Sequence, residues 1–342
     1  MDGNVTIKIM PRRAPCKCIT PWLRVLAAAV FLVSTAISVT LEAAAQAYPT
    51  RTVKLIENVG PGGTFDIFGR ALASELQKRM GQAFIMEPRP GGNFMLAGRA
   101  CAEAPSDGYT LCALSGETLV YSDFLYKNVG YDAKRDFTPV TNLFFNTQVL
   151  VAHKSLGIKS LAELPTVAKA KPLAFVTPAV AQRLFLQRFN KQHGIDIVNV
   201  PFRGGGEALT GILNGTTQIA FFGGANFAPL IAEGTLVGLA VDGQKRSPLF
   251  PEVPTLIELG YTERLNRNYF GIVAPGATPK AIIAQMNRAI VEILETPEFR
   301  QKHLIDRALE PIGDSPEDFA RFLEVDREEF RKVTREADIT PQ

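Results

Sequence analysis

The feature that most constrains the fold is a glycine-rich turn at residues 60–66, Gly-Pro-Gly-Gly-Thr-Phe-Asp. A strand-like apolar run at 53–59 precedes this turn, and a helix-like segment at 66–80 follows it. Glycines at such a junction let backbone N–H groups point toward one place, and the positive end of the helix adds its partial charge. The sequence therefore predicts an anion site, in which a hydroxyl or a capping carboxylate supports the amides. Its candidate residues are Gly62, Gly63, Thr64 and Asp66.

The same succession of strand, loop and helix recurs along the chain, which is typical of an α/β fold with mostly parallel strands covered by helices. Strands are predicted at 53–59, 83–87, 109–114, 148–152, 173–176, 197–200, 218–222, 237–241 and 270–274. Helices are predicted at 66–80, 93–104, 160–169, 180–192, 206–214, 226–233, 279–294, 297–305 and 316–336.

Three further loops stand between a predicted strand and the helix that follows it. Ligands of open α/β sheets bind at the carboxyl edge of the strands, where such loops lie. Each loop alone could be a tight turn, but four of them, two in each half of the chain, predict a cleft lined by N–H donors that suits a carboxylate. Their candidate residues are Ser115, Gly116 and Thr118; Thr177 and Ala179; and Arg203, Gly204 and Gly205.

The N-terminus has the pattern of a secretory signal peptide at residues 1–47. A basic stretch is followed by an apolar run at 25–41 and by small residues at Ala45 and Ala47, where a signal peptidase would cut. A permanent anchor is the alternative, but it needs about 20 apolar residues. Cleavage would leave equal numbers of acidic and basic residues, which argues against nucleic acid or an anionic membrane as partner. The sequence leaves the true start codon open.

Two cysteines, Cys101 and Cys112, remain after the predicted cleavage. Export permits a disulfide between them, and two buried thiols are the equal alternative. We expect no metal site, because no histidine lies near either cysteine in sequence.

Enzyme chemistry has little support in the sequence. The three histidines, His153, His193 and His303, stand in no recognisable motif, and the chain has no Gly-x-Ser-x-Gly, Walker or His-Glu-x-x-His pattern. A dinucleotide fingerprint is also missing, so we expect neither an enzyme nor a cofactor. A secreted hydrolase that uses Ser115 with a distant histidine is the outside alternative.

Several motifs together resemble the Bug family, the extracytoplasmic solute-binding proteins of tripartite tricarboxylate transporters. The matching segments are 48–49, 61–66, 87–93, 107–111, 131–132, 136–140, 200–206, 251–255 and 271–279. The resemblance implies a two-lobed periplasmic-binding-protein fold, type II-like, with two mixed sheets flanked by helices. Lobe 1 would comprise 48–149 and 269–342, and lobe 2 would comprise 150–268, with two crossing segments as a hinge.

In that family the first loop holds a ligand carboxylate through backbone groups and ordered waters, a role that the resemblance implies for residues 62–66. This chain departs from the family at Ala179 and Ala181, where glycines are usual, and at Phe65, which replaces a small polar residue. Residues 221–226 also lack the acid that often follows that strand, so an ammonium-bearing ligand has no obvious partner there. Phe65 instead favours a partly apolar or aromatic carboxylate.

The sequence thus predicts a periplasmic, monomeric solute-binding protein that captures a small organic anion for the membrane subunits of a tripartite transporter. The alternative is a ligand-sensing partner of a membrane signalling protein. The sequence does not decide between the two roles, nor which carboxylate binds.

Overall fold

The computed structural model describes residues 48–62, 64–177, 180–200, 205–261, 267–336 and 339–342. The predicted signal peptide lies outside these ranges, as do four candidate site residues: Gly63, Ala179, Arg203 and Gly204. Within these ranges no helix combines the length and apolar character needed to cross a membrane.

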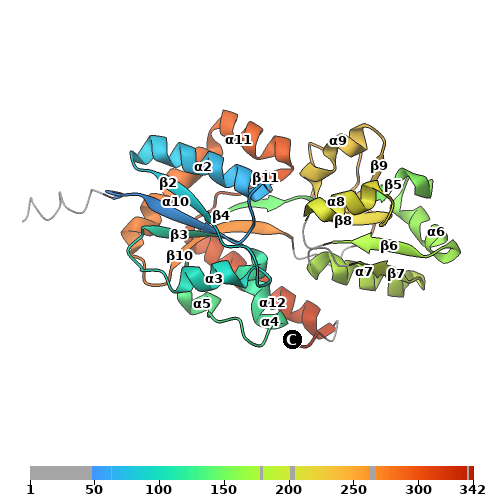
Figure 1. Cartoon of the computed structure of the whole chain (residues 1–342), viewed down its shortest axis with the longest axis horizontal. Coiled ribbons are helices and arrows are strands. Elements are labelled where there is room, and N and C mark those ends of the chain that lie inside the picture. The colour runs from blue at the N-terminus through green and yellow to red at the C-terminus, as the bar shows by residue number, and fades with distance from the viewer. Residues whose placement is uncertain (1–47, 63, 178–179, 201–204, 262–266, 337–338) are drawn as a thin grey trace, which may run out of the picture. The chain divides into compact units, whose positions relative to one another are not determined.

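One mixed sheet is built from both ends of the described chain (Figure 1). Its order is β11 (Leu309–Pro311), β4 (Phe137–Asn146), β10 (Tyr269–Pro275), β3 (Thr110–Ser115), β1 (Val53–Glu57) and β2 (Phe84–Pro88). The strands β1, β2 and β3 run parallel to one another, whereas β4, β10 and β11 pair antiparallel with their neighbours.

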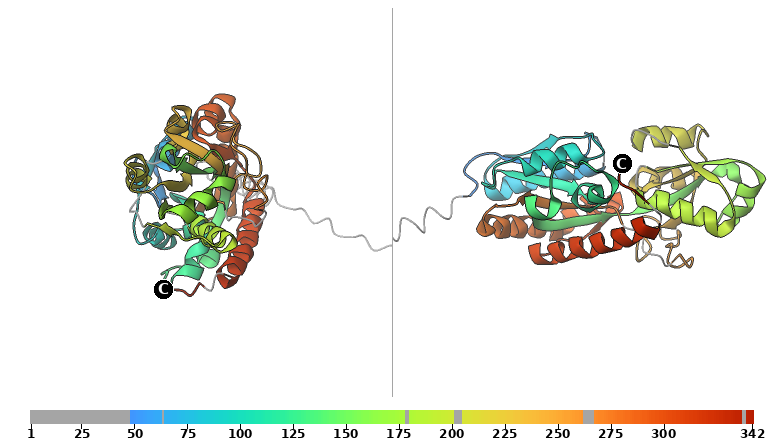
Figure 2. Two further views of the ribbon diagram at one scale, coloured as in Figure 1. Left: turned by 90° about the vertical axis from the view of Figure 1, so that its right-hand side faces the viewer. Right: turned by 90° about the horizontal axis from the view of Figure 1, so that it is seen from below.

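Helices cover both faces of this six-stranded sheet (Figures 1 and 2). On one face lie α2 (Thr64–Met80), α10 (Lys280–Glu295) and α11 (Pro297–His303); on the other lie α3 (Met95–Ala102) and α12 (Pro316–Glu336). The long helix α12 starts where the Ser315 hydroxyl accepts the N–H of Asp318, a capping contact that satisfies a free helix-end donor. A short π-helix (Glu117–Tyr121), α4 (Ser122–Leu125) and α5 (Ala133–Asp136) follow β3.

The second mixed sheet comes from the middle of the chain. Its order is β7 (Ile197–Asn199), β6 (Leu173–Val176), β8 (Ile219–Gly223), β5 (Gln148–His153) and β9 (Leu236–Val241). Figure 1 shows α8 (Gly205–Leu213) and α9 (Ala228–Ala232) on one side of it, and α6 (Leu164–Ala170) and α7 (Val180–His193) on the other.

The chain passes between the two sheets at closely bonded crossings. Thr147 alone separates β4 from β5, and its N–H donates to the Ala308 carbonyl at 2.9 Å. The N–H of Asn146 donates to the carbonyl of Asn268, just before β10, at 2.8 Å. The bond from Asn146 joins the first crossing to the second, and the bond from Thr147 joins it to the residue before β11. The predicted lobe boundaries stay a prediction.

Every predicted strand is present, most of them shifted by one or two residues at an end, but two strands were not predicted. The sequence interpretation missed β4, whose Pro139 cannot donate to a sheet, and the three-residue β11. It also expected an ordinary helix after Ser115, whereas residues 117–121 form a π-helix. The structure resolves one open alternative, because Cys101 of α3 and Cys112 of β3 form a disulfide.

Candidate functional site

A cavity of about 190 Å³ lies where the two sheets meet, and we call it the main cavity because residues of the predicted ligand loops line it. The first sheet contributes residues from the loops after β1 and β3, and the second sheet contributes residues from the end of β8. Phe94 comes from the loop after β2, and the two crossings supply the rest. The lining residues are Val59, Thr64, Phe65, Phe94, Ser115, Glu117, Asn146, Gln148, Phe222, Gly223, Asn226, Asn268 and Phe270.

Strand register explains why these residues meet. Parallel pairing of β1 with β3 puts the loops after both strands at one edge. Antiparallel pairing sets Phe270, near the start of β10, opposite Ser115 at the end of β3. In the second sheet Gln148 at the start of β5 pairs with Gly223 at the end of β8. Residues distant in sequence therefore share the edge that forms the cavity.

The first predicted loop is stabilised by its own carboxylate. Gly62 has a φ of 84°, a left-handed conformation that favours glycine, and its N–H donates to Asp66 at 2.9 Å. Asp66 also pairs with Arg70 at 2.7 Å. Burial alone would raise the pKa of Asp66, but the bonds from Arg70 and Gly62 outweigh it and lower the pKa. Asp66 thus shapes the loop, whereas Thr64 in the first turn of α2 reaches the cavity.

The second predicted loop is held by a buried asparagine. The Asn58 carboxamide donates to Ser115 Oγ at 2.8 Å and to Thr118 Oγ1 at 2.7 Å. Thr118 Oγ1 in turn donates to the Phe94 carbonyl at 3.1 Å, so this hydroxyl is used inside the wall. At Gly116 a Cβ would lie 2.7 Å from the buried Tyr269 ring, so the loop requires glycine. Of this loop, Ser115 and Glu117 line the cavity.

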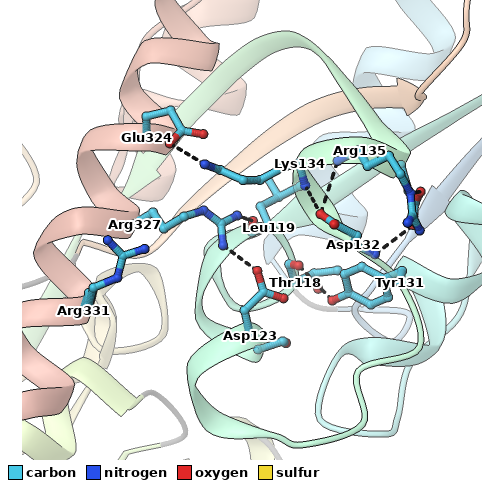
Figure 3. Close-up of polar contacts among 12 residues, drawn as sticks. Thr118, Leu119, Asp123, Tyr131, Asp132, Lys134, Arg135, Glu324, Arg327 and Arg331 are labelled. Atoms are coloured by element: carbon cyan, nitrogen blue, oxygen red, sulfur yellow. Dashed lines mark hydrogen bonds and ion pairs between the residues drawn. The ribbon is translucent and has the colours of Figure 1, made fainter.

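Side chains from other parts of the chain donate hydrogen bonds to backbone carbonyls of the π-helix after this loop (Figure 3). Arg327 of α12 donates to the Leu119 carbonyl at 3.0 Å and pairs with Asp123. The Tyr131 hydroxyl donates to the Thr118 carbonyl at 2.8 Å. A π-helical turn, with backbone bonds between residues five apart, is rare and often occurs at functional sites. Here side chains from other elements bond its carbonyls.

The loops predicted in the second half contribute less than expected among the described residues. Thr177 is buried and is not among the described residues that line the main cavity, and Gly205 begins α8. Phe222, Gly223 and Asn226 line it instead. The sequence interpretation also missed the crossing residues Asn146, Gln148, Asn268 and Phe270. Their only sequence signal is a position next to a strand end, which many residues share.

The cavity combines aromatic rings, carboxamides and one acid. Phe65 stacks on Phe270 with ring centroids 4.3 Å apart. Glu117 is the one ionisable side chain among the described lining residues. Burial raises the pKa of Glu117, against hydrogen bonds from Ser115 and Asn268 and the positive charge of Arg183.

Metal and hydrolytic chemistry find no support in the described part of the chain. No three His, Cys, Asp or Glu side chains gather there as metal ligands. No histidine is among the described residues that line the main cavity, and His193 contacts Tyr261 instead.

A family profile described as "tripartite tricarboxylate transporter family receptor" matches residues 68–338. The chain belongs to this family. It is a solute-binding receptor of periplasmic-binding-protein fold and not an enzyme. The resemblance to the Bug proteins is confirmed: the receptor is 30% identical to protein BugT of Bordetella pertussis, over 92% of this chain and 97% of that protein.

Two solved structures support the same fold for the receptor. An R. palustris protein solved with adipate is 30% identical, with a TM-score of 0.79 over 86% of this chain and 100% of that one. MatC from Rhodopseudomonas palustris, with bound malate, is 27% identical, with a TM-score of 0.73 over 84% and 99% of the two chains. The two-lobed α/β fold predicted from the sequence is therefore correct.

Proposed function

We propose that this receptor is exported to the periplasm, captures a small organic carboxylate in the main cavity and delivers it to the membrane subunits of a tripartite transporter. The observation that supports the ligand class most strongly is the pair of similar receptors solved with adipate and with malate. Residues 1–47, with their basic, apolar and small-residue segments, support the export step.

The chemistry of the cavity suits this role. The first turn of α2 has N–H groups without partners inside the helix, and it carries the positive end of the helix dipole. Thr64 and Phe65 belong to this turn and line the cavity. The carboxamides of Asn146, Gln148 and Asn226 add further donors around the same space. Ordered water can complete the contacts, as it does at many polar sites.

Capture would use motion at the crossings. Because the cavity walls come from both sheets, a ligand that contacts both walls favours a closed arrangement of the lobes. Closure removes water, and hydrogen bonds to a carboxylate are stronger in the drier site.

Calorimetry on residues 48–342 tests the ligand class. We expect at least one member of a panel of mono-, di- and tricarboxylates to bind and to raise the melting temperature. Thr64→Val removes only the hydroxyl at the cavity and should weaken that binding, whereas Thr166→Val, at an exposed position near the start of α6, should not. Binding of neutral or cationic solutes with failure of every carboxylate would overturn the proposal.

Two cellular measurements test export and delivery. N-terminal sequencing of protein from the periplasmic fraction should find a chain that begins at Tyr48. Deletion of the gene should abolish uptake of the bound carboxylate, and the full-length chain should restore it. Intact uptake in the deletion strain would contradict the transport role and leave a sensing role.

A further inference from the structure

Glu117 occupies a place in the cavity wall that the sequence interpretation did not assign to the site. It lines the main cavity and also a second cavity of about 90 Å³. Tyr126 and Arg183 of α7 are among the residues that line the second cavity. Phe94 is the other described residue that lines both spaces. Glu117 therefore stands at the boundary between them.

The position of Glu117 is fixed by hydrogen bonds to its main chain and side chain. The Ser122 hydroxyl donates to the Glu117 carbonyl at 2.6 Å. Ser115 Oγ accepts from Asn58, so its own hydrogen is available for the Glu117 carboxyl, to which it is hydrogen bonded. Asn268 provides a second side-chain hydrogen bond. A carboxyl group held in this way is preorganised for recognition.

The surroundings of Glu117 in the main cavity favour a positive ligand group. The other described residues that line the main cavity carry no charge, and Arg183, whose positive charge also acts on Glu117, lines only the second cavity. The carboxamides in the main cavity can donate or accept. Burial raises the pKa of Glu117, and a cationic nitrogen beside it would favour the ionised carboxylate, whereas a ligand carboxylate would meet a like charge in that ionised form. A cationic nitrogen there would gain a charge-assisted hydrogen bond, and the faces of nearby aromatic rings such as Phe94 also attract cations.

We propose that Glu117 selects ligands that carry a cationic nitrogen in addition to a carboxylate, which makes amino acids and related amino carboxylates the preferred class. This inference rests on the proposed function, since the carboxylate would lie at the start of α2 and the nitrogen beside Glu117. It revises one expectation from the sequence, that an ammonium group finds no acidic partner because residues 221–226 have none. The acid comes from the opposite side of the cavity, in the loop after β3.

Calorimetry with matched ligand pairs tests the inference. Each pair shares one carbon skeleton with and without the amino group: phenylalanine with 3-phenylpropanoate, aspartate with succinate, and glutamate with glutarate. The wild-type receptor should bind the amino member of at least one pair more tightly than its partner. Glu117→Gln, which keeps the size and removes the charge, should weaken binding of that amino acid by roughly tenfold to a hundredfold. Binding of the amino-free partner should stay the same or become tighter.

The ratio of the two affinities within one variant is the decisive quantity, because a folding defect lowers both alike. Glu57→Gln is the matched control, since Glu57 is a buried acid at the end of β1 that is not among the described lining residues of the main cavity. It should leave the ratio unchanged. Tighter binding of the amino-free partners, or an unchanged ratio in Glu117→Gln, overturns the inference while the carboxylate function stands. Binding of phenethylamine, which has no carboxylate, as tightly as phenylalanine would overturn the proposed function itself.

Discussion

Phe94 places an aromatic ring between the two cavities at a cost in backbone strain. Its φ is 72°, in the left-handed region, where a residue with a Cβ is disfavoured by roughly 1–2 kcal/mol. Its carbonyl accepts the Thr118 hydroxyl, which helps to hold this conformation. Strain retained beside a cavity suggests that the ring serves ligand binding.

Comparison of two substitutions separates strain from ring contact at Phe94. Phe94→Gly and Phe94→Ala both remove the ring, but only alanine keeps the strain. The glycine variant should be more stable than the alanine variant by about 1–2 kcal/mol in urea unfolding. Both should lose ligand affinity to the same extent. Equal stability of the two variants would argue against strain, and unchanged affinity would remove the ring from the site.

Glu57 makes the stability of the receptor depend on pH. Burial and then repulsion from Asp66 raise the pKa of Glu57 from 4.5 to about 8. Between these values the folded state keeps a proton that the unfolded chain has lost. Stability therefore falls as pH rises through this window, by at most about 1.4 kcal/mol per pH unit.

Replacement of Glu57 by glutamine removes this pH dependence. The unfolding free energy of Glu57→Gln relative to wild type should increase between pH 5 and pH 8, measured by urea unfolding. Glu87→Gln on the neighbouring strand is the control: hydrogen bonds from Arg89 and Lys54 lower the pKa of Glu87, so its ionisation is complete in this range. Parallel curves for wild type and Glu57→Gln would show that Glu57 ionises normally.

At the scale of elements, α12 fixes the π-helix that presents Glu117. Arg327 is 8% exposed and bonds both the Leu119 carbonyl and Asp123 (Figure 3). Arg327→Leu would leave these acceptors without their donor and should cost about 2–3 kcal/mol in unfolding free energy. Arg321→Leu breaks only an exposed pair with Asp318 on the same helix and should stay within about 0.5 kcal/mol. Similar losses in both variants would contradict a specific role of Arg327.

Elements with a regular apolar period could be predicted from the sequence. A strand that contains a residue disfavoured in sheets, such as proline, could not. The ends of α12 were predicted to the residue, because Pro316 follows a capping serine and the helix has one apolar face. In contrast, β4 contains Pro139 opposite Val273, where the pairing with β10 shifts register. That irregularity accommodates a residue without an N–H, and it depends on a strand more than 120 residues away in the chain.

The residues of the candidate site show the same difference between those with a local sequence signature and those placed by distant contacts. Thr64 and Ser115 were predicted because a loop between strand and helix has a local signature. Asn146, Gln148 and Asn268 were not predicted, because these residues reach the cavity through the pairing of the two crossings. Asp66 and Thr118 were predicted as ligand contacts; in the structure Asp66 bonds its own loop, whereas Thr118 bonds Asn58 and Phe94 of the loops after β1 and β2.

At the scale of the whole molecule, the bonded crossings imply that both sheets unfold together. Thr147 bonds Ala308, and Ala308 packs in a hydrophobic cluster of the second sheet although it directly precedes β11 of the first. The disulfide between Cys101 and Cys112 lies wholly beside the first sheet and closes a short loop with a sequence separation of 11. Removal of this disulfide would therefore destabilise the first lobe directly, and its effect on the stability of the second lobe can be measured.

Removal of the disulfide in a Cys101→Ala, Cys112→Ala variant should cost about 3 kcal/mol, through the greater freedom of the unfolded chain. If the lobes form one cooperative unit, this loss applies to amides of both sheets, and the slowest amides should exchange about a hundredfold faster in each. Hydrogen exchange by mass spectrometry can compare Leu111–Leu114 in β3 with Ile219–Phe222 in β8. Faster exchange confined to β3 would show that the second lobe unfolds independently of the first. The crossings would then act as flexible connections, and the free energy of ligand binding rather than the chain itself would unite the two lobes.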